Sequence, residues 1–468
     1  MFAKIQQIHF VGIGGIGMSG IAEVLLNLGY GVSGSDLRHS AVTERLAGMG
    51  AAVFEGHRAE NIAGAEVVVT SSAIAAENPE VLEAHKLHVP VIQRAEMLAE
   101  LMRLKYGIAI AGMHGKTTTT SMVAAVLAGG GLDPTVVVGG RVDAMGSNAR
   151  LGKSQYLVAE ADESDRSFLK LSPILSVVTN IDREHMDCYR NMRDVKKTFL
   201  EFMDRVPFYG MVVACNDDPP LRRLLPEVRR RTVTYGTKRG SDFLIKLGSS
   251  SGPVRVGDGA PLSRFRVSYS KKDLGEFTLH VPGVHNVLNA TAAIAVGVGL
   301  DVGLEAIRGA LDQFRGVERR FQLRGRAAGV SVIDDYGHHP TEIKATLAAA
   351  RQCRFRKVHV VFQPHRYTRT RDLIEKFTTA FGDADSLFVL DIYAASEKPI
   401  EGVSGQALAS TIRENGGGNA QYVSSFGGAA SAAAAVAEDG DMILTLGAGS
   451  VSQLGPIILE KLQEREAA

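Results

Sequence analysis

The sequence predicts an α/β protein of three modules, on the basis of three observations. Short β-rich runs alternate with helical patterns along the 468 residues, as in proteins built from parallel βαβ units. The alternation restarts twice, which divides the chain into residues 1–104, 105–320 and 321–468. Most strand candidates end in glycine or polar residues, and open parallel sheets bind ligands at the carboxyl ends of their strands. A chain of this length is also too long for one hydrophobic core.

The first module is predicted to be a small Rossmann-like sheet. Its strand candidates are IHFVGIG, GYGVSGSD, VVVTSS and VPVIQR, and helical patterns separate them. The first helix is expected from about Met18 to Leu28. Strands alternating with helices in this way imply parallel pairing.

The second module begins with KYGIAIAGMHGKTTTTSMVAAVLAGGG, again a strand, a glycine-bearing turn and a helix. The strand candidates YLVAEAD, LSVVTNID and MVVACND follow it. This order predicts a P-loop-type nucleotide-binding domain. Residues 247–262, rich in Ser, Gly and Pro, are predicted to form a surface loop between edge strands.

The third module is predicted to be a further Rossmann-like α/β domain. Its strand candidates are VSVIDDYGHHP, KVHVVFQPH, SLFVLDIY and DMILTLGAG. The alanine-rich run AASAAAAVAEDG has high helix propensity and is predicted to be a helix. The polar segments DDYGHH, QPHRYTRT, DIY and GAGS follow strands, so we expect them to line one cleft.

Composition excludes several classes of protein. Lys plus Arg (52) nearly equals Asp plus Glu (51), so no net charge attracts nucleic acid or an anionic membrane. Cys188, Cys215 and Cys353 have no metal-binding or disulfide spacing. The amino terminus has no signal-peptide pattern, and no apolar stretch is long enough to span a bilayer. We therefore expect a soluble, cytoplasmic protein without nucleic-acid or membrane partners.

A G-x-G-x-x-G pattern at Gly12, Gly14 and Gly17 follows the first strand. Glycines at these positions let a pyrophosphate approach the backbone at a helix amino terminus. Asp36 lies about twenty residues further on, where NAD-binding proteins place a carboxylate for the ribose. Taken alone, the pattern also fits a tight turn that binds nothing.

A second glycine turn, residues 112–118, carries a lysine followed by threonine. Its backbone amides and Lys116 could hold nucleotide phosphates, and the Thr117 hydroxyl could bind Mg²⁺. The turn is not a strict Walker A motif, because Ile110 occupies the position of its first glycine. A chance Gly-Lys-Thr is the alternative.

Further candidates for a Mg·ATP site follow the phosphate loop. Glu160 begins the acidic run EADESD, and TNIDREHMDCY contains Asn180 and His185. Carboxylates and an imidazole at strand ends suit a divalent cation, although an acidic run is more often a solvated surface. Downstream, GVHNVLNATAA contributes three residues to the first turns of a helix, where asparagine could cap the helix or bind adenine. These are His285, Asn286 and Asn289.

The third module supplies two polar stretches at strand ends. DDYGHHPTEI contains Tyr336 and His338, and FQPHRYTRT contains His365, Arg366 and Arg369. The two arginines are three residues apart, so on a helical turn both guanidinium groups would face one carboxylate. Histidines in such stretches are otherwise often structural.

Together these motifs resemble the Mur ligase family, in the family's order and over essentially the whole chain. The matching stretches are the short G-x-x-G-K-T turn, T-N-x-x-x-x-H-M-D, G-x-H-N-x-x-N-A, FRGVERRFQ, DDYGHHPTEI and FQPHRYTRT. The resemblance implies an N-terminal Rossmann-like UDP-binding domain, a central ATPase domain and a C-terminal amino-acid-binding domain. It replaces the NAD interpretation, because this family binds the diphosphate of a UDP-sugar at the first glycine turn.

GIGGIGMSGIAE is the form found in the alanine-adding branch of the family. The implied reaction uses ATP and Mg²⁺ to join L-alanine to the carboxylate of UDP-N-acetylmuramate through an acyl phosphate, a cytoplasmic step of peptidoglycan precursor synthesis. A murein peptide ligase or a folylpolyglutamate synthetase-type ligase is the nearest alternative. An oxidoreductase would leave the Gly-Lys-Thr turn without a role, and a non-catalytic regulator would not need the third-module residues. A monomer or weak homodimer is expected.

The resemblance also implies residue roles. Lys116, Arg320 and His338 are catalytic; Thr117, Glu160 and His185 bind metal, with Glu163 as the alternate carboxylate. ATP contacts Gly112, Met113, His114, Gly115, Lys116, Thr117, Thr118, His285, Asn286 and Asn289. The UDP-sugar and amino acid contact Gly12, Gly14, Gly15, Gly17, Met18, Ser19, Asp36, Ser71, Tyr336, His338, His365, Arg366 and Arg369.

Two positions depart from the family's common pattern. Met113 stands where most members have threonine. Several members carry a carbamylated lysine about fifteen residues after the metal-binding histidine, and that count leads to Leu200. The alanine-adding branch lacks this lysine. Lys196 and Lys197 lie near enough to leave the register open.

Overall fold

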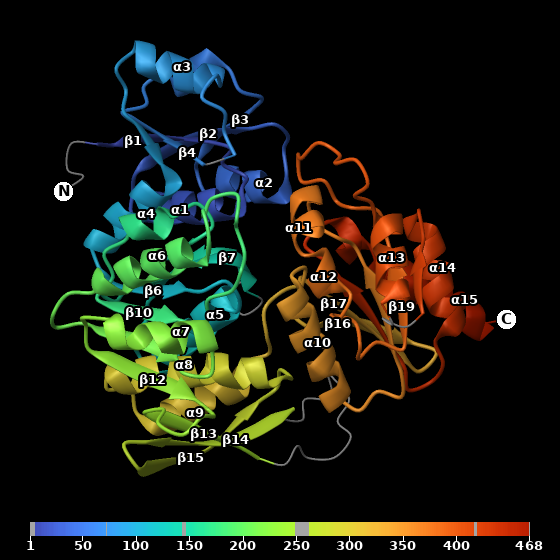
Figure 1. Ribbon diagram of the computed structural model, residues 1–468. Helices are drawn as coiled ribbons and strands as arrows, with labels where there is room; N and C mark the ends of the chain where they lie inside the picture. The colour runs from blue at the N-terminus through green and yellow to red at the C-terminus, as the bar shows by residue number, and fades with distance from the viewer. Residues whose placement is uncertain (1–4, 72, 143–146, 249–261, 416–418, 468) are drawn as a thin grey trace. The chain divides into compact units, whose positions relative to one another are not determined.

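The computed structural model describes residues 5–71, 73–142, 147–248, 262–415 and 419–467 (Figure 1). It contains three separate β-sheets flanked by helices, which confirms the predicted α/β class. None of the helices in this part of the chain is long and apolar enough to cross a membrane. Most of the predicted surface loop, residues 249–261, lies outside the described residues.

The chain forms two compact units. The first comprises Met1–Lys246, Arg266–Gly275 and Leu288–Leu311, and the second comprises Leu247–Phe265, Glu276–Val287 and Asp312–Ala468. The first unit thus holds the N-terminal sheet and the phosphate-loop side of the central sheet.

The N-terminal sheet has five parallel strands in the order β3-β2-β1-β4-β5. The chain moves from β1 to β2 on one side and later to β4 on the other, so a ligand crevice is expected at the carboxyl end of β1. The elements are β1 (Gln7–Val11), α1 (Ile16–Asn27), β2 (Gly31–Asp36), α2 (Ala41–Gly48), β3 (Ala52–Glu55), η1 (Ala59–Ile62), β4 (Val67–Thr70), α3 (Pro79–Lys86), β5 (Val91–Gln93) and α4 (Arg94–Arg103).

The central sheet has the order β15-β14-β13-β12-β11-β10-β6-β9-β7-β8. Its middle strands are buried along nearly their whole length, as expected for parallel strands covered on both faces. The elements are β6 (Tyr106–Ala111), α5 (Lys116–Gly129), β7 (Thr135–Val142), β8 (Ser147–Arg150), β9 (Tyr156–Glu160), η2 (Ser167–Lys170), β10 (Leu175–Val178), α6 (Met192–Asp204), β11 (Met211–Cys215), α7 (Pro219–Leu224), η3 (Leu225–Glu227), β12 (Thr232–Gly236), β13 (Phe243–Leu247), β14 (Ser263–Tyr269), β15 (Lys272–Leu279), α8 (Val284–Gly299) and α9 (Leu304–Gln313).

The third sheet has the order β16-β17-β21-β18-β19-β20, with β16 antiparallel to β17 and the remaining pairs parallel. Apolar clusters cover both of its faces. The alanine-rich run forms α14 as predicted, and its small side chains are buried against one of these clusters. The elements are β16 (Gln322–Ala327), β17 (Val330–Asp335), α10 (Pro340–Gln352), β18 (Val358–Phe362), α11 (Tyr367–Asp372), α12 (Ile374–Phe377), β19 (Ser386–Val389), α13 (Gly405–Glu414), β20 (Ala420–Tyr422), α14 (Phe426–Val436), β21 (Met442–Leu446), η4 (Ser450–Gln453) and α15 (Leu454–Ala467).

Candidate active site

A cavity of about 620 Å³ lies where the switch between β2 and β4 predicts a ligand crevice. This volume suits a small-molecule ligand. The turn between β1 and α1 forms one wall, and Gly12 adopts a φ of +79°, which favours glycine. The cavity is lined by Gly12, Gly14, Gly15, Ile16, Gly17, Met18, Asp36, Arg38, His39, Ser40, Ser71, Ala73, Ile74 and Arg94.

Most of the predicted UDP-sugar residues therefore lie together, with one exception. Ser19 is buried inside α1, where its hydroxyl donates to the carbonyl of Ile16 at 3.0 Å. Its side chain is not part of the cavity wall. Asp36 also acts on the protein itself, because its Oδ2 accepts a hydrogen bond from the Gly14 amide at 2.8 Å.

The phosphate loop joins β6 to α5 with two glycines in conformations that disfavour other residues. Gly112 has a φ of +137°, and a side chain there would collide with the Thr179 hydroxyl. Gly115 has a φ of +81°, and a side-chain carbon there would lie 2.9 Å from Oδ1 of Asn289. Asn289, on α8, thus packs directly against the loop. Its contact with the nucleotide stays a prediction.

The loop is also held from the end of β10. The side chain of Asn180 accepts from the His114 amide at 2.9 Å and donates to the His114 carbonyl at 2.9 Å. The Thr179 hydroxyl donates to the same carbonyl at 2.7 Å. Met113, the departure from the family pattern, is buried, so its side chain packs inward. The T-N dipeptide therefore sets the shape of the phosphate loop.

Lys116 lies among carboxylates at the first turn of α5. Its Nζ donates to Glu163 Oε1 at 2.7 Å and to the Gly112 carbonyl at 2.7 Å. Burial acts to lower the pKa of Lys116, but Glu163, Asp162 and Glu160 outweigh it and raise that pKa. The lysine is therefore charged at neutral pH, as a phosphate-binding cation must be.

Of the predicted metal ligands, His185 lies beside Glu163, the carboxylate named as the alternate to Glu160. Its Nε2 is 3.7 Å from Glu163 Oε1, and its backbone has a φ of +56°. Burial raises the pKa of Glu163 to about 7, against the effect of Lys116. Glu163 Oε2 is buried and has no hydrogen-bond partner among the described residues. Glu160 ends β9 and lines a small pocket with Asp162.

This donor set fits a divalent cation. An unsatisfied buried carboxylate oxygen costs free energy unless a cation or donor compensates it. The Glu163 carboxylate supplies the oxygen ligand that Mg²⁺ prefers, with the His185 imidazole beside it. Thr117 lies in the first turn of α5 and Glu160 at the end of β9, and their binding of the same cation stays a prediction.

At the start of α8, His285 and Asn286 are more buried than a surface cap would be. Burial is the largest cause that lowers the pKa of His285 to about 4, with a further effect from Arg320. The ring is therefore neutral at physiological pH. Asn286 donates to the carbonyl of Pro282 at 2.6 Å.

In the second unit, the paired arginines divide their roles. Arg319 donates to Asp334 Oδ2 at 3.1 Å and to the Gly447 carbonyl at 2.6 Å, which fixes the entry to the third sheet. Arg320 lies with its guanidinium carbon 5.0 Å from the centre of the Tyr336 ring and 3.7 Å from Glu342. Arg319 is thus fixed by two hydrogen bonds within the protein. Arg320, which is the predicted catalytic arginine, has only the ring contact and the longer ion pair among these contacts.

His338 and His365 lie together beyond the ends of β17 and β18. Their ring centres are 5.6 Å apart, and Nδ1 of His338 is 3.1 Å from the Tyr336 carbonyl. Because a carbonyl only accepts, that Nδ1 donates and Nε2 of a neutral His338 is the basic nitrogen. Burial, with lesser effects of His338 and three arginines, lowers the pKa of His365 to about 3.

The predicted geometry of Arg366 and Arg369 needs correction. Helix α11 begins at Tyr367, and Arg366 precedes it with a φ of +69° and ψ of 138°. Helical spacing therefore does not relate the two side chains, and the prediction that it aligns them was wrong. Arg369 is within the helix, and its Nη1 donates to Nδ1 of His365 at 3.0 Å.

Sequence reasoning did not select several residues of the first cavity. Arg38, His39 and Ile74 line it, and so does Arg94, the first residue of α4. None of them belongs to a glycine or phosphate motif. The position of Arg38 and His39 two and three residues after Asp36 was the available signal, whereas Arg94 offered none.

Three family models match the chain. The models described as "Mur ligase family, catalytic domain", "Mur ligase middle domain" and "Mur ligase, glutamate ligase domain" match residues 7–106, 110–297 and 319–449. The chain belongs to the Mur ligase family. Its α/β fold has the three-domain architecture of Mur ligases, and ATP is the family's energy source.

Individual Mur ligases are similar over the full length. The chain is 73% identical over 469 residues to UDP-N-acetylmuramate--L-alanine ligase of Koribacter versatilis, with 100% of both chains covered. It is 63% identical over 465 residues to the ligase of the same name from Acidobacterium capsulatum, with 99% of each covered. The crystal structure of UDP-N-acetylmuramate-alanine ligase from Thermotoga maritima superposes with a TM-score of 0.80 at 30% identity, covering 98% of this chain and 99% of that one.

Proposed function

We propose that this protein joins L-alanine to the carboxylate of UDP-N-acetylmuramate, with conversion of ATP to ADP and phosphate, in peptidoglycan precursor synthesis. The observation that carries the proposal is the full-length similarity at 73% identity to a ligase of that name. The chemistry of the sites agrees with it. One cavity suits a nucleotide sugar, a phosphate loop holds a charged lysine, and a basic cluster in the second unit suits an amino acid.

The first step transfers the γ-phosphoryl group of ATP to the sugar carboxylate, giving an acyl phosphate and ADP. A carboxylate does not acylate an amine at neutral pH, so this activation is needed. Lys116 offers its charge to the phosphates, and Arg320 adds a second cation to the developing charge. Thr117, Glu160, Glu163 and His185 would hold Mg²⁺, which would supply positive charge to the phosphates.

In the second step, the amine of alanine attacks the acyl carbon, and phosphate leaves. The ammonium group must first lose a proton. We assign this role to Nε2 of His338, because its Nδ1 is turned to the Tyr336 carbonyl. Arg366 and Arg369 are assigned to the carboxylate of alanine, because guanidinium groups form strong hydrogen bonds with carboxylates. The neighbouring His365 is neutral, so it adds no positive charge.

We also propose the domain limits and the setting. Residues 1–104 bind the UDP-sugar, 105–320 bind ATP and 321–468 bind the amino acid, in accord with the ranges that the family models match. ATP and UDP-sugars are cytoplasmic metabolites, which supports a cytoplasmic location. We expect a monomer or weak homodimer without nucleic-acid or membrane partners, which sedimentation can test.

Substrate identity is tested by phosphate release. We expect release only when ATP, UDP-N-acetylmuramate and L-alanine are all present, with other amino acids giving much lower rates. Because the alternative is a murein peptide ligase, the alanyl peptide L-Ala-γ-D-Glu-meso-diaminopimelate is included in the panel. Preference for that peptide over L-alanine would overturn the proposed acceptor while retaining the ligase chemistry.

The metal assignment predicts a change in Mg²⁺ dependence. Glu160→Gln, Glu163→Gln or His185→Ala should raise the Mg²⁺ concentration for half-maximal rate by about tenfold or more, the size typical of disturbed metal sites. Calorimetric titration of Mg²⁺ into the ADP-bound protein should show the same weakening. Glu201→Gln, which alters an exposed ion pair on α6, is the matched control. Unaltered Mg²⁺ binding in all three variants would remove these residues from the metal site.

A further inference from the structure

Arg94 lies against the glycine turn of the first cavity. A side-chain carbon added at Gly17 would lie 3.2 Å from both Cδ and Cζ of Arg94, and closer still to Nη1. The third glycine of the G-x-G-x-x-G pattern therefore leaves room for a guanidinium group beside the first turn of α1. Arg94 is one of the residues that line the cavity.

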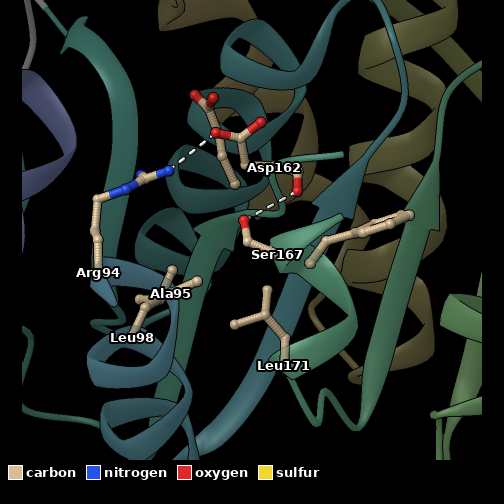
Figure 2. Close-up of a pocket in the computed structure, with 8 residues that line it drawn as sticks. Arg94, Ala95, Leu98, Asp162, Ser167 and Leu171 are labelled. Carbon is tan, nitrogen blue, oxygen red and sulfur yellow. Dashed lines mark hydrogen bonds and ion pairs between the residues drawn. The ribbon is translucent and has the colours of Figure 1, made fainter. Parts of the chain in front are cut away.

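The other side of the same guanidinium group reaches the acidic run after β9. Nη2 of Arg94 donates to Oδ2 of Asp162 at 2.9 Å, as Figure 2 shows. The second oxygen of Asp162 accepts from the amide and hydroxyl of Ser164 at 3.1 and 2.7 Å. Arg94 thus lies between the first cavity and the acidic run after β9.

A diphosphate bound in this cavity would need a positively charged side chain such as Arg94 beside it. The carboxylate of Asp36 accepts the hydrogen bond of the Gly14 amide, which places a negative charge at this turn. That charge would repel a diphosphate bound there. Among the described residues that line the cavity, Arg38 and Arg94 are the only arginines or lysines. Arg38 is exposed on a loop, whereas Arg94 is half-buried and held by its ion pair. Arg94 is the better-ordered cation.

We propose that Arg94 binds the diphosphate of the UDP-sugar and gives up part or all of its contact with Asp162 when it does so. The inference rests on the proposed function and adds a substrate-contacting residue to it. Asp162 is then a positioning residue that competes with the substrate.

Calorimetry on the full-length protein with UDP, UMP and uridine tests the contact. Arg94→Ala should weaken UDP binding by about ten- to a hundredfold, the usual loss for a charge-assisted hydrogen bond, and leave uridine binding nearly unchanged. Arg94→Lys keeps the charge and should retain part of the affinity. In turnover, Arg94→Ala should raise the KM for UDP-N-acetylmuramate with little change in the KM for alanine.

The competition between Asp162 and the substrate predicts that removing the Asp162 carboxylate changes UDP affinity in the opposite direction. Asp162→Asn removes the rival carboxylate, so UDP should bind several-fold more tightly than to the parent protein. The matched control is Lys170→Ala, which removes the neighbouring contact of Lys170 with Glu96 at 2.8 Å between η2 and α4. This control should leave UDP affinity unaltered, because its side chain is not part of the cavity.

Two results would overturn the inference. Unchanged UDP affinity in folded Arg94→Ala would mean that the guanidinium does not contact the diphosphate. Equal weakening by Arg94→Ala, Asp162→Asn and Lys170→Ala would assign the ion pair to packing between α4 and η2. Failure of the parent protein to bind UDP or UDP-N-acetylmuramate is a different outcome, since it would reject the proposed function and the inference together.

Discussion

Lys116→Ala should lower the ligation rate by on the order of a hundred- to a thousandfold, the loss typical when one group that stabilises transition-state charge is removed. The reason is geometric. The Lys116 ammonium lies within the phosphate loop, bonded to the Gly112 carbonyl and Glu163. Its removal also leaves Glu163 as a buried carboxylate without its cation. Both effects act against phosphoryl transfer.

The same variant should bind UDP-N-acetylmuramate nearly as well as the parent protein. The glycine turn that lines the first cavity follows β1, whereas the phosphate loop follows β6 in a different sheet. Calorimetry with the UDP-sugar and with ADP separates the two sites. Lys197→Ala, an exposed lysine on α6, is the matched control. A large loss of UDP-sugar affinity in a folded Lys116→Ala protein would show that the two nucleotides were assigned to the wrong domains.

Much of this arrangement could be predicted from the sequence because its signals are local. Glycines at 112 and 115 adopt backbone angles that only glycine readily accepts, so the phosphate loop follows from the chain itself. The periodicity of the strands gave the three sheets, and polar residues at strand ends gave the regions of the sites. Even the first helix differs little from its expected range, since it begins two residues earlier, at Ile16, and ends one residue earlier, at Asn27.

What the sequence did not reveal depends on contacts between distant segments. Nothing in the run VIQRAEML indicates that Arg94 packs on Gly17, because that contact requires α1 and α4 to lie side by side. Likewise, β9 ends at Glu160, so strand alternation cannot say whether Glu160 or Glu163 turns toward His185. The structure places Glu163 there. Arg366 was misjudged because its positive φ keeps it out of α11, which begins one residue later, at Tyr367.

The corrected geometry leaves a specific expectation for amino-acid capture. Arg369→Ala should raise the KM for L-alanine by roughly ten- to a hundredfold, since a charge-assisted hydrogen bond contributes about 1.5–3 kcal/mol. Arg366→Ala should have an effect of the same kind. His365 cannot replace either arginine as a cation, because burial and its basic neighbours keep it neutral. The KM values for ATP and the UDP-sugar should change little.

Alaninamide distinguishes carboxylate capture from other roles of these arginines. It lacks the carboxylate, so it should be a poor substrate for the parent enzyme and lose little more activity in Arg366→Ala or Arg369→Ala. Arg371→Ala serves as the matched control, because Arg371 is exposed on the same helix and pairs with its neighbour Asp372. Arg369 also donates to His365 Nδ1, so its removal could disturb that ring instead. In that case activity would fall equally with alanine and alaninamide, and the arginine would have to be reassigned from the substrate carboxylate to support of the histidine pair.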